Sequence, residues 1–406
     1  MNGVLEKVRA LLGADAVLDP GGGAAGIAPR IAPPSIEAAA LLLGTATAEG
    51  WKVRVEGAGS WQSADAPADL ALTTRRLDQV ESIEPQDLVA TAQAGIGWDR
   101  LRQQLAERGV WVALDPPGLA GRTVGSILAS ATAGPLRQGF GAVRDQLLGL
   151  TAVTGDGRVV TAGGRVVKNV AGYDLTRLQT GAFAAFGVIA RVHLRLRALP
   201  RADLTLVLEG PREELSRAAD ELRESGLGPA ALELLSPALA RRAGWVLAVR
   251  CAGSVAQVEA EEATVRAAAG GRFARLGAEE SHAFWQRAAE GLAVRTVTFR
   301  LGGLPDSTDD LLDLLQHQLG DEWVSAAPAL GAVRWSGEAT AEHLRRLRRS
   351  LAALEVPLTL ERAPWELRRA VGIFGAYREG IGPLVAGLRR TFDPAGTLVV
   401  PVATDE

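Results

Sequence analysis

The spacing of apolar and polar residues predicts alternating short strands and few helices in the first half of this 406-residue chain. Residues 36–49 follow Pro34-Ser35 and precede Gly50, which are start and stop signals of a helix. Residues 52–55 alternate like a half-buried strand and lead into a glycine-rich loop. Further strands are predicted at 70–73, 88–92, 110–114, 147–153, 159–161 and 188–196, and a further helix at 98–108.

A second pattern, of longer helices between strands and without a glycine-rich loop, begins at Pro200. Strands are predicted at 204–209, 232–235, 246–249, 294–300 and 332–335, and helices at 211–225, 255–269, 279–290, 308–319 and 341–354. The tail predicts a helix from Ile381, a turn at 392–396 and an apolar end. The arginine-rich helix 341–354 is typical of a solvated face, with a binding role as the alternative.

Composition and charge exclude several classes of protein. With 47% hydrophobic and 22% charged residues, the chain is typical of soluble globular proteins, and its length favours two domains. A net charge of −3 gives no reason to expect nucleic acid or an anionic membrane as a partner. No apolar run reaches the roughly 18 residues of a membrane span. The first residues do not have the pattern of a secretory signal, so we expect a cytoplasmic protein.

Cysteine and histidine usage argues against a metal centre or an iron–sulfur cluster. A single cysteine, Cys251, excludes an intramolecular disulfide and a cluster held by cysteines of this chain alone. The four histidines show no metal-ligand spacing. His282, His317 and His343 stand alone on predicted helices, and His193 is interpreted as an exposed position of a strand. None is therefore preferred as a general base.

Three segments rich in small residues are candidates to hold one dinucleotide. In Gly57-Ala58-Gly59-Ser60, successive N–H groups can form a nest for a pyrophosphate, with the Ser60 hydroxyl as a further donor. The loop lacks the full fingerprint of a nicotinamide-binding Rossmann domain. Residues 123–134 are nearly all small and carry hydroxyls that can donate without bulk; a tightly packed helical turn explains them equally well. Residues 139–150 place Arg144 and Asp145 beside glycines, with a surface ion pair as the alternative.

The run from Gly163 to Ile189 places Lys168, Asn169 and Tyr173 between glycines. Glycine permits close approach of the backbone to a flat ligand, although each glycine alone is explained by a turn. Lys168 is one of three lysines in the chain, and no role is assigned to it.

Together these motifs resemble the FAD-binding domains of the vanillyl-alcohol oxidase and para-cresol methylhydroxylase (PCMH) superfamily. Residues 123–134 are similar to its Thr-Ile-Gly-Gly-x-x-Ala-Thr-Asn element, with Ser126 and Ala131 in place of a glycine and the asparagine. Residues 139–150 resemble its Tyr-Gly-x-Val-Arg-Asp-x-Val-Leu-Gly element. The run from Gly163 to Leu178, together with the aromatic Phe183, is most similar to the FAD-binding E subunits of bacterial glycolate oxidases.

The resemblance implies an α+β fold: a PCMH-type FAD-binding domain of two α/β subdomains, an α/β cap domain, and a C-terminal segment that returns to the FAD domain. We accordingly divide the chain into an N-terminal segment 1–30 with a flexible Pro-Gly run, an FAD domain 31–199, a cap 200–365 and a C-terminal segment 366–406. FAD is expected to be bound non-covalently, because the glycine loop has no histidine. The implied FAD contacts are Glu56, Gly57, Ala58, Gly59, Ser60, Trp61, Pro117, Thr123, Gly125, Ser126, Ala129, Ser130, Gly134, Arg144, Asp145, Gly181, Gly187 and Ile189.

The resemblance also implies a function, namely electron relay or assembly in the oxidation of glycolate to glyoxylate. The implied partners are a catalytic FAD subunit and an iron–sulfur subunit, with possible inner-membrane association through them. Catalytic residues are not assigned. One alternative is a self-sufficient FAD-linked oxidase of another hydroxy acid or alcohol, with Arg334, Tyr173 or Lys168 near the flavin ring. The other is a scaffold that has lost FAD, motivated by Ser126, Ala131 and a tail without the usual asparagine and Gly-Arg.

Overall fold

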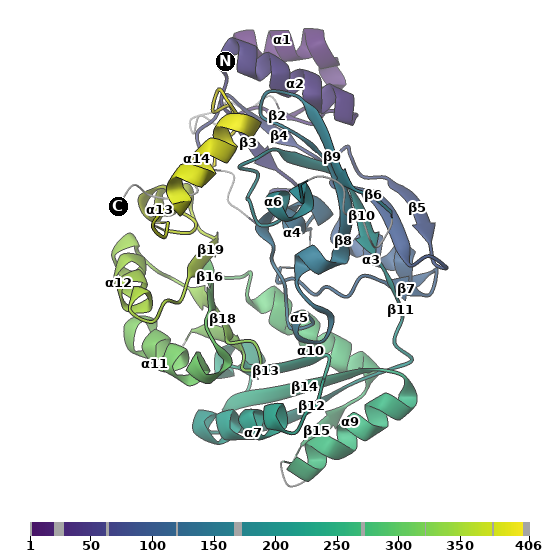
Figure 1. The fold of residues 1–406 in the computed structure, drawn as a ribbon, viewed down its shortest axis with the longest axis vertical. Coiled ribbons are helices and arrows are strands. Elements are labelled where there is room, and N and C mark those ends of the chain that lie inside the picture. Colours follow the sequence, from purple (N-terminus) through teal and green to yellow (C-terminus); the bar gives the residue numbers. More distant parts are fainter. Residues whose placement is uncertain are drawn as a thin grey trace.

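The computed structural model describes residues 2–19, 28–61, 65–118, 121–165, 173–268, 273–320, 322–375 and 377–400. Two sheets from the N-terminal half form one end of the molecule, and a third, larger sheet forms the other end (Figure 1). The mixed architecture matches the predicted α+β class. Among the described residues, no helix is both long and apolar enough to cross a membrane.

The first sheet has four strands in the order β1-β2-β4-β3, and it packs against two helices. The predicted helix 36–49 is confirmed: the Ser35 hydroxyl caps it by accepting from the Ala38 N–H at 3.1 Å, and Gly50 ends it in the left-handed conformation. Helix α1, within the segment interpreted as an N-terminal extension, was not predicted; the Pro-Gly run itself lies outside the described residues. The elements are α1 Asn2–Leu12, β1 Val17–Asp19, β2 Arg30–Ile31, α2 Ile36–Glu49, β3 Val53–Glu56 and β4 Leu70–Thr73.

The second sheet is antiparallel, with the order β5-β6-β10-β8-β9. Helices α3 and α4 bury Trp98, Leu101 and Ile127 in the same core as its strands. The predicted hairpin is confirmed as β8 and β9. The elements are β5 Val80–Glu84, β6 Val89–Gln93, α3 Trp98–Ala106, β7 Val110–Trp111, α4 Val124–Ser130, α5 Arg137–Phe140, the 3₁₀ helix η2 Val143–Gln146, β8 Leu147–Val153, β9 Val159–Gly163, α6 Leu175–Gln179, β10 Val188–Arg195 and β11 Arg197–Ala198.

The third sheet has eight antiparallel strands in the order β15-β12-β14-β13-β17-β18-β16-β19. All its strands lie between Ala202 and Arg362, and the boundaries chosen at 200 and 365 stay a prediction. The elements are β12 Ala202–Gly210, α7 Arg212–Glu224, β13 Ala231–Leu235, α8 Pro237–Ala240, β14 Trp245–Gly253, α9 Val255–Ala268, β15 Ala274–Leu276, α10 Ala278–Gly291, β16 Val297–Gly302, α11 Thr308–Leu319, β17 Trp323–Ala327, β18 Ala332–Gly337, α12 Ala341–Ala352 and β19 Leu358–Arg362.

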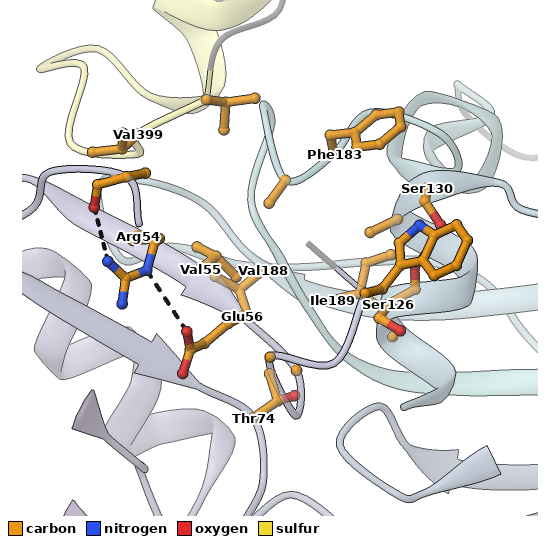
Figure 2. A pocket seen from close by; sticks show the side chains of 18 of the residues that line it. Arg54, Val55, Glu56, Thr74, Ser126, Ser130, Phe183, Val188, Ile189 and Val399 are labelled. Atoms are coloured by element: carbon orange, nitrogen blue, oxygen red, sulfur yellow. Dashed lines mark hydrogen bonds and ion pairs between the residues drawn. The ribbon is translucent and has the colours of Figure 1, made fainter. Parts of the chain in front are cut away.

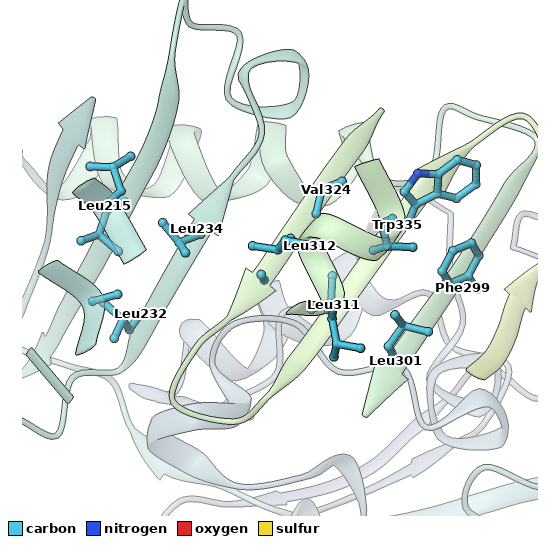
Figure 3. Packing of buried hydrophobic residues seen from close by; sticks show 14 of the residues in the cluster. Leu215, Leu232, Leu234, Phe299, Leu301, Leu311, Leu312, Val324 and Trp335 are labelled. Atoms are coloured by element: carbon cyan, nitrogen blue, oxygen red, sulfur yellow. The ribbon is translucent and has the colours of Figure 1, made fainter. Parts of the chain in front are cut away.

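Period-two alternation assigns the two faces of this sheet. In β12, Leu206 and Leu208 pack with helices α7, α9, α11 and α12, whereas Val207 packs on the opposite face with α10. Figure 3 shows the first of these cores, where Leu311 and Leu312 of α11 lie among Val324, Trp335 and the leucines of β13. Helix α10 faces the N-terminal half, because Ala289 belongs to the core of the second sheet.

The C-terminal segment returns to the first sheet, as predicted. It contains α13 Trp365–Val371 and α14 Ile381–Phe392, and Leu398 then forms a parallel bridge with Val53 of β3. The buried carboxylate of Asp393 fixes the turn by accepting from the N–H groups of Thr397 and Leu398 at 2.7 and 3.0 Å. The tail therefore lies along the strand that leads into the glycine loop.

Candidate functional site

The candidate site is an open pocket between the first two sheets, and the space inside it, open solvent included, is about 1030 Å³. Figure 2 shows Arg54 and Val399 at one end, Ser126 and Ser130 at the other, and Val55 and Val188 between them. Strand β3, helix α4, strand β10 and the C-terminal tail each supply part of the wall.

Most of the predicted contact residues lie together in this wall. Those that line the pocket are Glu56, Gly57, Ala58, Gly59, Ser60, Trp61, Gly125, Ser126, Ala129, Ser130, Gly187 and Ile189. Those that do not line it are Pro117, Thr123, Gly134, Arg144, Asp145 and Gly181. The pocket thus brings together segments from residue 56 to residue 189, as the predicted site requires.

The glycine loop has two glycines with different physical roles. A Cβ atom added to Gly57 would lie 2.2 Å from Oγ1 of Thr123, so any side chain would collide with the start of α4. A Cβ atom added to Gly59 would make only ordinary contacts, the nearest at 3.7 Å, but its φ of +74° favours glycine. Among the described residues, the backbone N–H groups from Gly57 to Ser60 donate no hydrogen bond. They are therefore available to an anion in the pocket.

The wall formed by α4 is held from behind by Arg122. This fully buried guanidinium donates to the hydroxyl of Ser130 at 3.0 Å and to the carbonyl of Ser126 at 3.2 Å, and it lies 4.4 Å from the ring centre of Trp61. Burial lowers the pKa of Arg122 to about 9, which leaves it protonated at neutral pH. The cation fixes the spacing between the Trp61 side and the α4 side of the pocket.

The hydroxyl groups of the wall correct one prediction. Ser60 donates to the carbonyl of Gly121 at 2.8 Å, Ser126 to that of Thr123 at 2.9 Å, and Ser130 to that of Ser126 at 2.7 Å. Their hydrogens are satisfied inside the protein, so they do not serve as donors to a ligand in this arrangement. Among the described residues, the backbone N–H groups of the glycine loop are donors left free to face a ligand.

Several further residues line the pocket. Phe183, Ala184 and Val188 belong to the motif run that ends at Ile189, whereas the others were not predicted: Arg54, Val55, Ala66, Thr74, Arg368, Ile373, Val399 and Val400. Phe183, noted in the sequence for its departure from the usual acid, packs edge-on against Phe374 with ring centres 5.7 Å apart. Val399 and Val400 show that the tail reaches the pocket although its motif is incomplete.

The predicted residues outside the pocket have structural roles. Thr123 lies behind Gly57 and caps α4 by accepting from the Ser126 N–H at 3.2 Å. Gly181 packs against Ala131, behind α4. Arg144 and Asp145 form a half-exposed pair 3.7 Å apart, so the alternative of a surface ion pair describes them better than a cofactor contact.

Pro117 and Gly134 line a smaller cavity, together with Asp115, Ser325 and Arg334, where the N-terminal half meets the third sheet. The nearby Glu233 is 4% exposed and accepts from the Ser325 hydroxyl at 2.5 Å. Burial raises the pKa of Glu233 to about 8, although Ser325 and Arg334 oppose this shift. Pro117 and Gly134 thus lie at this smaller cavity and not in the lining of the larger pocket, and their contact with FAD stays a prediction.

A buried ion-pair cluster clamps the third sheet onto the end of α4. The Glu361 carboxylate, fully buried, binds Arg300 at 2.7 Å and Arg334 at 2.9 Å. Arg300 also donates to the carbonyl of Ser130 at 3.2 Å, and Arg334 donates to that of Ala133 at 2.9 Å. Burial alone raises the pKa of Glu361, but the two arginines outweigh it and lower the pKa to about 2.

Of the residues considered for a self-sufficient oxidase, the two that the structure describes, Arg334 and Tyr173, do not line the pocket. Arg334 is engaged by Glu361, and Tyr173 is 93% exposed. Lys168, Asn169 and Gly172 lie outside the described residues.

The histidines give no site either. His193 is half-buried and not exposed, and its Nδ1 lies 2.9 Å from the Thr91 hydroxyl on the neighbouring strand. Burial and two arginines lower the pKa of His193. Within the described ranges, no three His, Cys, Asp or Glu side chains are grouped as a metal site would require.

Comparisons with known proteins agree with a flavin site. A family model described as an FAD binding domain matches residues 28–163. The chain is 32% identical over 263 residues to glycolate oxidase subunit GlcE of Escherichia coli, a match that covers 63% of this chain and 67% of GlcE. It is 32% identical over 160 residues to the mitochondrial D-lactate dehydrogenase [cytochrome] of Arabidopsis thaliana, covering 39% and 28% of the two chains. Glycolate oxidase subunit GlcD of Bacillus subtilis is 28% identical over 167 residues, covering 41% and 36%.

The fold is shared with solved structures of much lower sequence similarity. Alkyldihydroxyacetonephosphate synthase superposes with a TM-score of 0.69 at 16% identity, over 91% of this chain and 76% of that chain. At that identity the likeness concerns the fold alone. It confirms the predicted fold, including the third sheet that the FAD binding model does not match.

Proposed function

This chain belongs to the FAD-binding protein family that includes glycolate oxidase subunit GlcE, and we propose that it is the FAD-binding subunit of a glycolate oxidase complex. In this proposal it acts in electron relay or assembly during oxidation of glycolate to glyoxylate. Its partners are a catalytic FAD subunit and an iron–sulfur subunit. The same proposal includes peripheral association with the inner membrane through those partners.

The observation that carries the cofactor site is the free N–H row of the glycine loop. The N–H groups from Gly57 to Ser60 donate to no other described residue and border the pocket between the first two sheets. A pyrophosphate supplies the acceptors that these groups lack. When bound, the isoalloxazine accepts and passes on electrons, and the protein's part is to bind it, orient it and exclude water.

The clamp on the third sheet supports a subunit without its own hydroxy-acid site. A small hydroxy acid needs a cation for its carboxylate, and both Arg300 and Arg334 are bound by Glu361 and by backbone carbonyls of the segment after α4. We propose that substrate oxidation takes place on the catalytic partner subunit.

The test begins with the purified chain reconstituted with FAD, its absorbance spectrum, and dye-linked glycolate and D-lactate oxidation. We expect one FAD per chain and no turnover alone. Added to the host complex purified from a strain without this subunit, the chain should restore glycolate-dependent dye reduction. Turnover by the isolated chain would instead establish a self-sufficient oxidase. Restoration by a chain that takes up no FAD would establish a scaffold.

A further inference from the structure

A guanidinium from a different strand lies against the glycine loop. Arg30 is on β2, and a Cβ atom added to Gly59 would lie 3.7 Å from its Nη2. Its Nε donates to Oε1 of Glu56 at 2.5 Å, and its side chain is 25% exposed. The carboxylate thus holds one edge of the guanidinium and leaves the Nη side at the loop.

The terminal nitrogens of Arg30 have no acceptor among the described residues. Nη1 and Nη2 donate no hydrogen bond, whereas Nε is fully engaged by Glu56. A guanidinium held at one edge presents its remaining N–H groups in a fixed fork, which matches the paired oxygens of a phosphate. The open fork therefore faces the same region as the free N–H row of the loop.

The charges around the loop are unbalanced in favour of cations. Glu56 is shared with a second arginine, Arg54, whose Nε lies 3.6 Å from its Oε2. A third, Arg75, donates to the carbonyl of Ala58 in the loop at 3.3 Å. Two arginines thus share one carboxylate and a third binds the loop itself, which makes the potential at the loop positive.

Of these three arginines, only Arg30 places terminal nitrogens without an acceptor among the described residues beside Gly59. The Nη1 of Arg54 donates to the carbonyl of Ala66 at 2.8 Å, and its Nε and Nη2 are buried without solvent contact. Arg54 lines the pocket, and its ion pair with Glu56 helps to fix the carboxylate that holds Arg30. Arg75 is exposed and binds the outer carbonyl of the loop.

We propose that Arg30 binds the pyrophosphate of FAD at Gly59 and that Glu56 orients its guanidinium for this contact. In oxidised FAD at neutral pH the pyrophosphate carries the formal negative charges, so it is the group that an unpaired cation recognises. The inference rests on the proposed placement of FAD in this pocket. It adds to the site a residue 26 positions before Glu56 that belongs to no motif.

The experiment titrates apoprotein with FAD by flavin fluorescence, and with ADP by competition against FAD. ADP serves as the probe because it retains a diphosphate but has no flavin. The variants are Arg30→Met, which removes the charge, and Arg30→Lys, which keeps the charge but not the fork. Arg76→Gln is the matched control, because Arg76 pairs with Asp15 at 3.0 Å and, among the described residues, has no contact with the glycine loop. Thermal unfolding of each apoprotein checks the fold.

We expect Arg30→Met to weaken FAD and ADP by the same factor, about tenfold to a hundredfold, as is usual for the loss of charged hydrogen bonds. Arg30→Lys should fall between it and wild type, and Arg76→Gln should match wild type. If Arg30→Met does not fold, Arg30→Lys decides with the same measurements.

Three results would overturn the assignment. The first is wild-type FAD affinity in a folded Arg30→Met or Arg30→Lys variant. The second is weaker FAD binding with unchanged ADP binding, which would place Arg30 at the flavin half. Failure of the wild-type chain to bind FAD is the third, and it would overturn the proposed function as well. In the first two cases the wild-type chain still takes up FAD, so the proposed function survives.

Discussion

Replacing Gly57 by alanine tests the pocket geometry most directly. The new Cβ would lie 2.2 Å from the Thr123 Oγ1, and that atom cannot swing away without giving up its hydrogen bond from the Ser126 N–H at 3.2 Å. Either the loop or the start of α4 has to shift by about 1 Å, because carbon and oxygen atoms not bonded to each other normally stay more than 3 Å apart. Both segments carry pocket-lining residues.

The cost follows from the size of this overlap. Overpacking a tight site typically costs about 1–3 kcal/mol. If the strain is relieved by moving the loop out of its FAD-binding position, this corresponds to FAD affinity weaker by about five- to a hundredfold. Gly59→Ala has a different physical basis, since its Cβ meets only atoms at 3.7 Å or beyond but its φ of +74° costs about 1–2 kcal/mol. Gly57→Ala thus tests space, and Gly59→Ala tests backbone conformation.

A double-mutant cycle with Thr123→Ala separates collision from other effects. Removing Oγ1 costs the cap of α4 about 1 kcal/mol, but it also removes the colliding atom. In this background Gly57→Ala should lose less FAD affinity than in the wild type, so the two changes are not additive. Gly59→Ala should be additive with Thr123→Ala. Gly164→Ala, which has open space and no positive φ, is the control.

Apoprotein titration with FAD by fluorescence quenching gives the affinities, and urea unfolding gives the stabilities. Wild-type affinity and stability in Gly57→Ala would refute the close approach of the loop to α4. Additivity of Gly57→Ala and Thr123→Ala would show that the loss has a cause other than the collision.

Two further predictions concern the contact between the third sheet and the N-terminal half. Glu361→Gln should destabilise the protein by about 3–5 kcal/mol in urea unfolding, because it leaves two partly buried arginines without their counter-charge. The control Glu338→Gln, at an exposed site, should have little effect. An equal loss of stability in both variants would contradict the clamp. The pKa of Glu233 is raised to about 8, so the folded protein keeps a proton that the unfolded chain releases near pH 4.5. The contribution of Glu233 to the free energy of unfolding therefore falls by up to about 1.4 kcal/mol per pH unit as the pH rises from about 4.5 to about 8. Glu233→Gln should flatten the dependence of unfolding free energy on pH over that window, and an unchanged slope would show that Glu233 is ionised when folded.

Elements with strong local signals were predictable from sequence. Helix α2 has a serine cap, an apolar face and a terminal glycine, and its observed bounds match the predicted ones. The glycine loop is equally local, because Gly57 and Gly59 follow a strand within three residues. Strand β10 was predicted, but the half-buried environment of His193 was not, since it depends on Thr91 of a neighbouring strand.

The parts of the site built by long-range contacts could not be read from local patterns. Arg368 and Val399 line the pocket and Arg30 lies beside Gly59; these residues come from segments far apart in the chain, and no spacing rule connects them to the loop. The hydroxyl groups of the α4 segment show the opposite error. Their composition suggested donors for a ligand, but in a short helix the hydroxyls of Ser126 and Ser130 donate to carbonyls three and four residues earlier.

If this flavin subunit has no substrate site of its own, its large third sheet needs another role. The Glu361 carboxylate forms ion pairs with both Arg300 and Arg334. Both arginines also donate to backbone carbonyls at or just after the end of α4, and other residues of this helix line the pocket. A substrate carboxylate would have to displace a fully buried glutamate whose pKa is about 2, and the displaced charge would then be left unpaired in the interior. The sheet is therefore better suited to fixing the pocket wall than to receiving a hydroxy acid. Because the third sheet holds α4 in place when the pocket is empty, FAD binding does not have to order that wall, and the binding free energy is not reduced by such an ordering step.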